Sequence, residues 1–279
     1  MNIVPEKTLN DFKLHLIEYE KSKATVDKYM RDVRAFFAWL GRTELNKEAV
    51  LCYKNDIVKT HAPASVNSML ASLNSFFDFC GLHNLKVRSI KIQRKIFAGE
   101  ARELTKAEYE RLLCTARAKG KNRLCLLMQT ICSLGLRVSE LQYITVSAVR
   151  QGSAQINCKG KMRTVIMPKQ ICKMLNKYIR KNGIKSGSVF VTKNGNPIDR
   201  SNIWSAMKAL CRIAGVPPEK VFPHNLRHLF ARTYYSLQKD VVRLADILGH
   251  SSINTTRIYT MECGEYHRAQ LQKLGLLLC

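Results

Sequence analysis

The chain has 279 residues, which is long enough for two domains that each bury a core. Lysine and arginine number 46 against 21 acidic residues, and the net charge of +25 favours a polyanionic partner, most often a nucleic acid. No apolar run approaches the roughly 18 residues that a membrane span needs, and the N-terminus lacks the apolar stretch of a signal peptide. The ten cysteines include no C-x-x-C pair, which disfavours zinc sites and disulfide scaffolds. We therefore expect a soluble, cytoplasmic protein with no membrane partner.

The positive charge is concentrated in the second part of the chain. Residues 1–100 hold 16 basic and 11 acidic side chains, a net charge of +5. Residues 101–279 hold 30 basic and 10 acidic side chains, a net charge of +20. The second part is therefore expected to make the stronger contacts with phosphate groups.

The N-terminal part has the pattern of a helical bundle. Apolar side chains recur at helical spacing over residues 9–19, 25–40, 49–58 and 66–81, and no strand pattern interrupts them. Residues 86–102 differ, because basic side chains and a glycine punctuate a stretch of weak periodicity, which is typical of an exposed connector. We place the domain boundary there, with a first domain of residues 1–97 and a second domain of residues 98–279.

The second domain combines helices with a small sheet. Thr105 and Glu108 fit a capping box that opens a helix, and the apolar run 124–136 predicts a buried helix that delivers Arg137 near its end. The predicted fold class is mainly α with a small antiparallel β-sheet. Strands are predicted over residues 153–157, 164–167 and 188–192, and further helices over 201–214, 226–237, 241–248 and 266–277.

Four short motifs carry side chains suited to phosphodiester chemistry. They are GLRVSEL at residues 135–141, HNLRH at 224–228, LGH at 248–250 and, nine residues later, Tyr259. Two arginines can fork onto phosphate oxygens, histidines stand beside them, and a phenol can act as nucleophile. This is the set of groups that transesterification at a phosphodiester needs when no metal is available.

Each motif also has an ordinary structural explanation. Arg137 can form an ion pair with Glu140, and the basic residues within 224–228 can form a solvated helix face. His250 can cap a helix C-terminus, and Tyr259 can pack its ring and hydrogen-bond its hydroxyl nearby. These explanations suffice for each residue alone, but they do not account for four such motifs in this order.

Taken together, the motifs resemble those of the tyrosine site-specific recombinases, the lambda-integrase and Xer-like family. The resemblance covers nearly the whole chain, because a helical first part followed by a basic linker is similar to the family's core-binding domain. It implies a helical, SAM-like core-binding domain followed by an α+β catalytic domain. The catalytic residues that it implies are Arg137, Lys159, His224, Arg227, His250 and the nucleophile Tyr259.

Two positions differ from the family pattern or leave a choice open. The family's lysine lies in a strand-turn-strand hairpin, and here the turn offers Lys159-Gly160-Lys161. Lys159 is preferred because it directly precedes the glycine, and Lys161 is the alternative. Ala148 stands where many relatives have an acidic residue, and we expect this change to alter local packing and leave the chemistry intact.

The resemblance implies a recombinase that cleaves and rejoins duplex DNA through a 3′-phosphotyrosyl intermediate, in integration, excision or resolution. The arginines would clamp the phosphate, the histidines would add hydrogen bonds and a proton route, and Lys159 would protonate the leaving 5′-oxygen. No metal, ATP or other cofactor is expected. The expected partners are double-stranded DNA at specific core sites and further copies of the chain. We expect a tetramer on DNA, in which the leucine-rich C-terminal helix of each copy docks on a neighbouring copy.

Two other functions use the same pattern. A type IB topoisomerase-like enzyme would relax DNA with the same chemistry, but the compact catalytic half and short tail favour a recombinase. A non-catalytic DNA-binding regulator derived from the fold would usually have lost one of the six site residues, whereas each has a candidate here.

Overall fold

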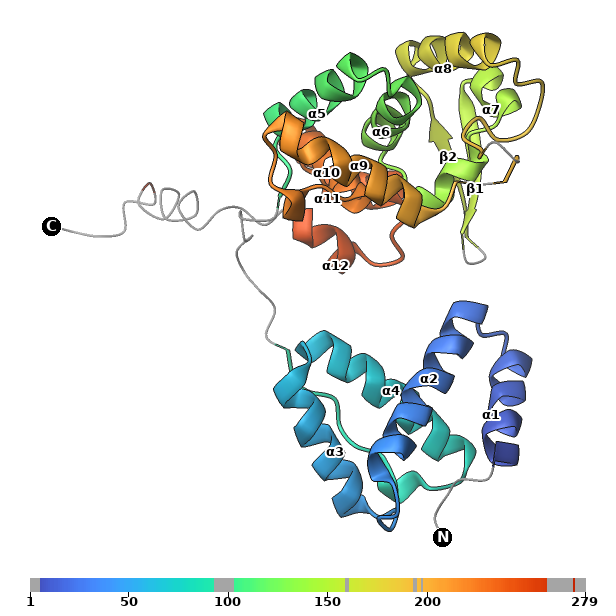
Figure 1. Ribbon diagram of the computed structural model, residues 1–279, viewed down its shortest axis with the longest axis vertical. Helices are drawn as coiled ribbons and strands as arrows, with labels where there is room; N and C mark the ends of the chain where they lie inside the picture. The colour runs from blue at the N-terminus through green and yellow to red at the C-terminus, as the bar shows by residue number, and fades with distance from the viewer. Residues whose placement is uncertain are drawn as a thin grey trace, which may run out of the picture. The chain divides into compact units, whose positions relative to one another are not determined.

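The computed structural model describes residues 6–92, 103–158, 161–192, 195–196, 198–259 and 273, with Cys158 and Lys161 as backbone only. The chain divides into two compact units, Met1–Arg94 and Lys95–Cys279, each of which is described by itself (Figure 1). The boundary predicted between residues 97 and 98 lies outside the described residues and stays a prediction. The predicted C-terminal helix over 266–277 and most of the basic connector also lie outside them.

The first unit is a helical bundle, as the sequence predicts. Helices α2 and α4 pack along each other, and the buried aromatic side chains of Phe12, Phe36 and Phe76 fill the space between the helices. Ser72 on α4 donates a hydrogen bond of 2.9 Å to the buried Asp32 on α2, so a polar contact also joins the two helices. Within residues 6–92 the elements are α1 (Glu6–Glu18), α2 (Lys23–Leu40), α3 (Lys47–Thr60), α4 (Pro63–Phe79) and the 3₁₀ turn η1 (His83–Leu85).

The second unit begins with the predicted capping box. Thr105 accepts a hydrogen bond from the backbone N–H of Glu108, whose carboxylate accepts one from the backbone N–H of Thr105. The helical elements from residue 106 to residue 181 are α5 (Lys106–Ala118), α6 (Asn122–Leu134), the 3₁₀ turn η3 (Val138–Tyr143), α7 (Val146–Gln151) and α8 (Lys169–Lys181). Helix α6 is buried along most of its length, as expected from its continuous apolar run.

The sheet of the second unit is an antiparallel hairpin. Strands β1 (Ser153–Cys158) and β2 (Lys161–Ile166) pair with Ser153 opposite Ile166 and Cys158 opposite Lys161. Side chains of β2 alternate, because Met162 and Ile166 are exposed while Val165 is buried. The predicted strands 153–157 and 164–167 are therefore confirmed apart from their ends.

The third predicted strand, residues 188–192, is wrong. Ser188 forms only an isolated bridge with Thr145, and the N–H of Val189 donates to the carbonyl of Ile144 at 2.8 Å. Val189 and Phe190 are buried in the core of the unit, so their apolar run reflects core packing rather than sheet pairing. The expected fold class, mainly α with a small antiparallel sheet, is nevertheless confirmed.

The remaining elements bring the last three motifs to α6. Helix α10 packs directly against α6, and α11 packs against α10 (Figure 1). These elements are α9 (Arg200–Ala214), the 3₁₀ turn η4 (Pro218–Lys220), α10 (Pro223–Gln238), α11 (Val241–Leu248), α12 (Ile253–Thr256) and the 3₁₀ turn η5 (Arg257–Tyr259). None of the helices in the described part has the length and apolar character to cross a bilayer.

Gly135 allows α6 to end close to α10 and α11. Its φ of +61° is a left-handed conformation, and a Cβ atom at this position would lie 2.5 Å from the ring of Phe230 and 3.1 Å from Leu248. Only glycine satisfies both constraints without moving the neighbouring elements.

The substitution Gly135→Ala should lower the free energy of unfolding of the second unit by about 3 kcal/mol, because backbone strain and overpacking add. Gly152→Ala is the matched control. Gly152 has a φ of +75° with no atom within 4 Å of the added methyl group, so it should cost about 1 kcal/mol of strain alone. Urea denaturation measures both changes, and equal losses would contradict the close packing at Gly135.

Candidate active site

Arg137 is presented by the turn that follows α6. After the left-handed Gly135 the chain turns, and Arg137 directly precedes η3. Its Nη1 donates a hydrogen bond of 2.8 Å to Oε1 of Glu140. The side chain retains 32% of its accessible surface, so part of its set of N–H donors is open to a ligand.

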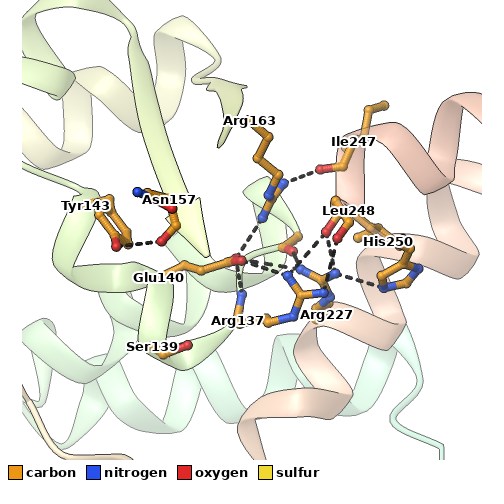
Figure 2. Close-up of polar contacts among 12 residues, drawn as sticks. Arg137, Ser139, Glu140, Tyr143, Asn157, Arg163, Arg227, Ile247, Leu248 and His250 are labelled. Atoms are coloured by element: carbon orange, nitrogen blue, oxygen red, sulfur yellow. Dashed lines mark hydrogen bonds and ion pairs between the residues drawn. The ribbon is translucent and has the colours of Figure 1, made fainter. Parts of the chain in front are cut away.

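The carboxylate of Glu140 is the centre of the polar network in Figure 2. Only 1% of its side chain is exposed. Its Oε2 accepts from the backbone N–H of Arg137 at 2.7 Å and from Nη2 of Arg163 at 2.7 Å, and Nη1 of Arg227 lies 3.7 Å away. Burial alone would raise the pKa of Glu140, but the hydrogen bonds and positive charges around it lower that pKa below its usual value. Glu140 is therefore ionised at neutral pH.

Arg163 reaches the same carboxylate from strand β2. Its other terminal nitrogen, Nη1, donates to the carbonyl of Ile247 near the end of α11. Only 13% of the side chain is exposed. Arg163 thus joins the hairpin, Glu140 and the end of α11 (Figure 2).

Arg227 lies on α10 and has no exposed side-chain surface. Its Nη1 donates to the carbonyl of Gly135 at 2.7 Å, and its Nη2 donates to the carbonyl of Leu248 at 2.6 Å and to Nε2 of His250 at 3.0 Å. The two carbonyls belong to the C-terminal ends of α6 and α11, where the helix dipole favours a cation. Burial and the charge of Arg137 lower the pKa of Arg227 to about 10, so it remains charged at neutral pH.

The contacts of His250 fix its tautomer. An arginine can only donate, so the Nε2 atom that faces Arg227 must be unprotonated, and the proton of the neutral ring lies on Nδ1. Nδ1 is 2.8 Å from the hydroxyl of the buried Thr256, which accepts this proton's hydrogen bond. Burial and then Arg227 lower the pKa of His250 to about 4, in agreement with a neutral ring.

Tyr259 is enclosed by this site. Only 4% of the residue is exposed, and its ring centre lies 4.9 Å from that of His228, in a perpendicular arrangement, and 6.1 Å from that of His250. Burial raises the pKa of Tyr259, while the charge and hydrogen bond of Arg227 and the charge of Arg137 act in the opposite direction. The phenol is therefore protonated at neutral pH and lies beside two cations that would stabilise its phenolate.

Two further histidines continue the row on α10. The ring centres of His224 and His228 are 4.5 Å apart. Burial, followed by the neighbouring His224 and Arg227, lowers the pKa of His228 to about 4. Partial burial, followed by the positive charges of Arg227 and Arg137, lowers the pKa of His224 as well. These imidazoles therefore add proton donors and acceptors at neutral pH, and no net charge.

A cleft of about 560 Å³ opens beside Arg137 and His224. Cationic and polar side chains from η3, the start of α9 and the start of α10 line it together with apolar neighbours. A negatively charged group entering this cleft would meet the exposed part of the Arg137 guanidinium. The polar and charged lining residues are Arg137, Ser139, Gln142, Asp199, Arg200 and His224.

The structure brings five of the six predicted site residues into one region. Arg137, Arg227 and His250 share direct or carbonyl-mediated contacts, Tyr259 packs beside them, and His224 lies on the cleft. Lys159 lies outside the described residues, as does the side chain of the alternative Lys161. The ion pair of Arg137 with Glu140, considered as an ordinary explanation, is present and forms part of the same site.

Sequence reasoning missed Arg163, Arg200 and Thr256. The alternation of β2 could have identified Arg163, because Met162 and Thr164 are exposed and Arg163 shares the inward phase with Val165. A cation in the buried phase of a strand requires an anionic partner. No pattern in the sequence marks Thr256, whose contact with His250 depends on the short helix α12.

Within the described residues, no group of three or more His, Cys, Asp or Glu side chains has the arrangement of a metal site. The acidic side chain in the centre of the network, Glu140, already accepts hydrogen bonds from Arg137 and Arg163. The positive charge in this region comes from guanidinium groups.

The buried histidines should make the second unit less stable as the pH falls. His228 and His250 resist protonation until about pH 4, whereas in the unfolded chain they bind protons near pH 6.5. The unfolded state is therefore favoured progressively as the pH falls below about 6.5. Urea midpoints should decrease between about pH 7.5 and about pH 5, above the range in which the lowered pKa of Glu140 contributes.

The substitution His228→Phe should reduce this pH dependence, because it removes a titrating group whose buried Nε2 has no hydrogen-bond partner among the described residues. His61→Asn, which removes an exposed histidine of the first unit, is the control and should leave the dependence unchanged. A pH dependence that is identical in wild type and His228→Phe would contradict the burial of a neutral His228.

Two family models match the chain. Residues 102–263 match the phage integrase family, and residues 9–81 match the N-terminal SAM-like domain of phage integrases. The tyrosine recombinase XerA of Thermococcus kodakarensis is 28% identical over 98% of this chain and 97% of its own length. The tyrosine recombinase XerD of Vibrio cholerae is 26% identical over 92% of each protein.

Solved structures share the fold. A lambda integrase fragment, solved as a dimer bound to a COC′ core site, superposes with a TM-score of 0.72 over 91% of this chain and 94% of the other, at 18% identity. XerH recombinase, solved with its difH substrate before cleavage, gives a TM-score of 0.67 over 88% of this chain and 78% of the other, at 21% identity. Because a family model matches more than half of the chain, the protein belongs to the phage integrase family, and the predicted tyrosine site-specific recombinase is confirmed.

Proposed function

We propose that this strand-transfer enzyme cleaves and rejoins duplex DNA at specific core sites through a phosphodiester link between Tyr259 and a 3′-phosphate. One observation carries the proposal. Two arginines, His250 and Tyr259 converge from separate segments on one region that is rich in hydrogen-bond donors and positively charged at neutral pH. The relatives that match this chain over nearly their whole length are named tyrosine recombinases, which supports the same function.

In the proposed reaction, the oxygen of Tyr259 attacks the phosphorus and the 5′-oxygen of the DNA leaves. Arg137 would donate to the non-bridging oxygens first, because its guanidinium is the one with exposed surface. Arg227 is fully buried and hydrogen-bonds Tyr259, so it would stabilise the developing phenolate. It would contact the phosphate once Tyr259 has approached the phosphorus. Charge that is fixed before the reaction lowers the barrier for the pentavalent transition state.

The histidines would carry the proton that Tyr259 loses. His228 flanks the phenol ring, is neutral at neutral pH and has an Nε2 with no hydrogen-bond partner among the described residues, so this imidazole can accept a proton there. His224 would donate a hydrogen bond to the phosphate from the cleft. Because the phosphotyrosyl ester has nearly the same energy as the original ester, rejoining to another 5′-hydroxyl would need no ATP.

Lys159 would supply the proton for the leaving 5′-oxygen. This role comes from the family resemblance, and Lys161 remains the alternative. The register of the hairpin supports a short connection here, because Cys158 pairs with Lys161 and only residues 159 and 160 join the strands.

The charge distribution supports a DNA partner. Residues 141–198 contain no aspartate or glutamate and 11 lysines and arginines. Within this range, Lys169, Lys173 and Lys177 recur at a spacing of four residues on the exposed side of α8. A protein surface usually mixes both signs of charge, so a stretch of one sign favours a polyanion, and binding should weaken strongly with salt.

Several finer points remain proposals. We propose a cytoplasmic location, which the free thiols of the cysteines described with their side chains support. We also propose a tetramer on DNA with the C-terminal segment docked in trans, since a lambda integrase has been solved as a tetramer on a Holliday junction. A topoisomerase-like activity is less favoured, because the similar proteins are named recombinases and integrases.

The substitution Tyr259→Phe should abolish covalent capture of DNA and leave binding nearly unchanged, because it removes only the attacking oxygen. A suicide substrate nicked near the cleavage site should trap the wild type as an adduct that survives denaturation. Tyr235→Phe, on the same unit, is the matched control and should retain the adduct. An equal yield of adduct from Tyr259→Phe would exclude Tyr259 as the nucleophile.

The two turn lysines can be separated with a substrate that carries a 5′-bridging sulfur, because a thiolate leaves without receiving a proton. Lys159→Ala should slow cleavage of ordinary DNA by about a hundredfold or more, and the bridging sulfur should restore much of the rate. Lys161→Ala should have a much smaller effect. Rescue at position 161 and not at 159 would transfer the role of general acid to Lys161.

A further inference from the structure

Arg163 makes contacts that neither phosphate binding nor hairpin packing explains. Its two terminal nitrogens are both engaged, one by the carboxylate of Glu140 at 2.7 Å and the other by the carbonyl of Ile247. The side chain is mostly buried. Both terminal nitrogens bond within the protein, and Nε is buried with no hydrogen-bond partner among the described residues. Arg163 is therefore poorly placed to bind a ligand and well placed to hold other groups.

The two acceptors of Arg163 adjoin the residues that act in the proposed reaction. Glu140 receives Nη1 of Arg137 on its other oxygen, so the orientation of Glu140 sets the orientation of Arg137. Ile247 lies three residues before His250, in the turn that ends α11. One side chain therefore contacts the partner of Arg137 and the backbone that leads to His250 (Figure 2).

The turn before His250 is shaped around Arg163. Gly249 has a φ of +64°, and a Cβ atom there would lie 2.5 Å from Cδ and 2.9 Å from Nε of Arg163. The aliphatic stem of Arg163 thus occupies the space that any other residue at position 249 would need. The carbonyl of Gly249 is also 3.5 Å from Nη2 of Arg137, so the same turn contacts both arginines.

We propose that Arg163 is a positioning residue for strand transfer, which holds Glu140 and the Leu248–His250 turn so that Arg137 and His250 meet the phosphate in a fixed geometry. This inference rests on the proposed function. Lysine cannot replace arginine in this role, because a single ammonium group lacks the planar fork that reaches two acceptors in different directions. A reacting group that is misplaced by about 1 Å can lose about a hundredfold in rate, so replacing a residue that orients such groups should slow the reaction measurably.

The test compares Arg163→Lys and Arg163→Gln with wild type in single-turnover cleavage of a suicide duplex. Both variants should slow cleavage by about ten- to a hundredfold while duplex binding changes by less than about threefold. Arg212→Lys is the matched control, because Arg212 is an exposed arginine in the last turn of α9, outside the basic stretch 141–198, and it should cleave at the wild-type rate. Circular dichroism establishes that the variants are folded, and Arg163→Gln is the second choice if Arg163→Lys is not.

A second substrate separates positioning from general destabilisation. A methylphosphonate at the scissile position lacks one charged non-bridging oxygen, so its cleavage depends less on correctly placed guanidinium groups. The loss caused by Arg163→Lys should therefore shrink by at least about fivefold on this substrate. A destabilised protein would lose the same factor on both substrates, and that result would overturn the proposal, as would a wild-type rate in Arg163→Lys.

A third substrate identifies which part of the site Arg163 serves. The 5′-bridging sulfur should not rescue Arg163→Lys if it acts through Arg137 and His250. Rescue by sulfur would show that Arg163 acts on protonation of the leaving group, which would overturn the assignment to Glu140 and the turn. A wild type that forms no adduct through Tyr259 would overturn the proposed function itself, whereas a normal wild type with unaffected variants would overturn only this inference.

Discussion

The site depends on the burial of one carboxylate. Glu140 has almost no exposed surface, and an isolated ionised carboxylate in such a position would be very unfavourable. It remains ionised because Arg137 and Arg163 donate to it and Arg227 lies close by. Arg137 directly precedes η3, Arg163 lies on β2 and Arg227 lies on α10, so the requirement to neutralise a single charge draws three distant segments of the chain together.

The arginines in turn depend on the ends of two helices. The carbonyls of Gly135 and Leu248 accept from Arg227, and those of Leu248 and Gly249 lie at 3.5 Å from Arg137. Helix C-termini carry partial negative charge and unpaired carbonyls, so they suit buried cations. Both helices end in a left-handed glycine, which lets the carbonyls face the arginines without side chains between them. The short motifs of the sequence thus encode backbone geometry as well as functional groups.

Local periodicity and turn residues predicted the helices of the first unit, most of those of the second unit and the hairpin, but α7 and α8 were not predicted. It also predicted Arg137 and Tyr259 as site residues through the family resemblance. It did not distinguish an apolar segment in the core from a third strand at 188–192, since periodicity over five residues is the same for both. Thr256 could not have been predicted either, because its contact with His250 arises only when α12 folds beside the end of α11.

Arg137 and Arg227 carry the same guanidinium group, but Arg137 is partly exposed and Arg227 is fully buried, so the two arginines suit different roles. Arg137 donates one hydrogen bond to Glu140 from Nη1 and keeps part of its guanidinium exposed, which suits first contact with a phosphate. Arg227 satisfies two helix ends and His250 at once, and it influences Tyr259 from a position that solvent does not reach. A buried charge acts more strongly than an exposed one because water screens it less. The fold therefore places the buried guanidinium of Arg227 beside Tyr259, the proposed nucleophile, and leaves the accessible guanidinium of Arg137 at the cleft.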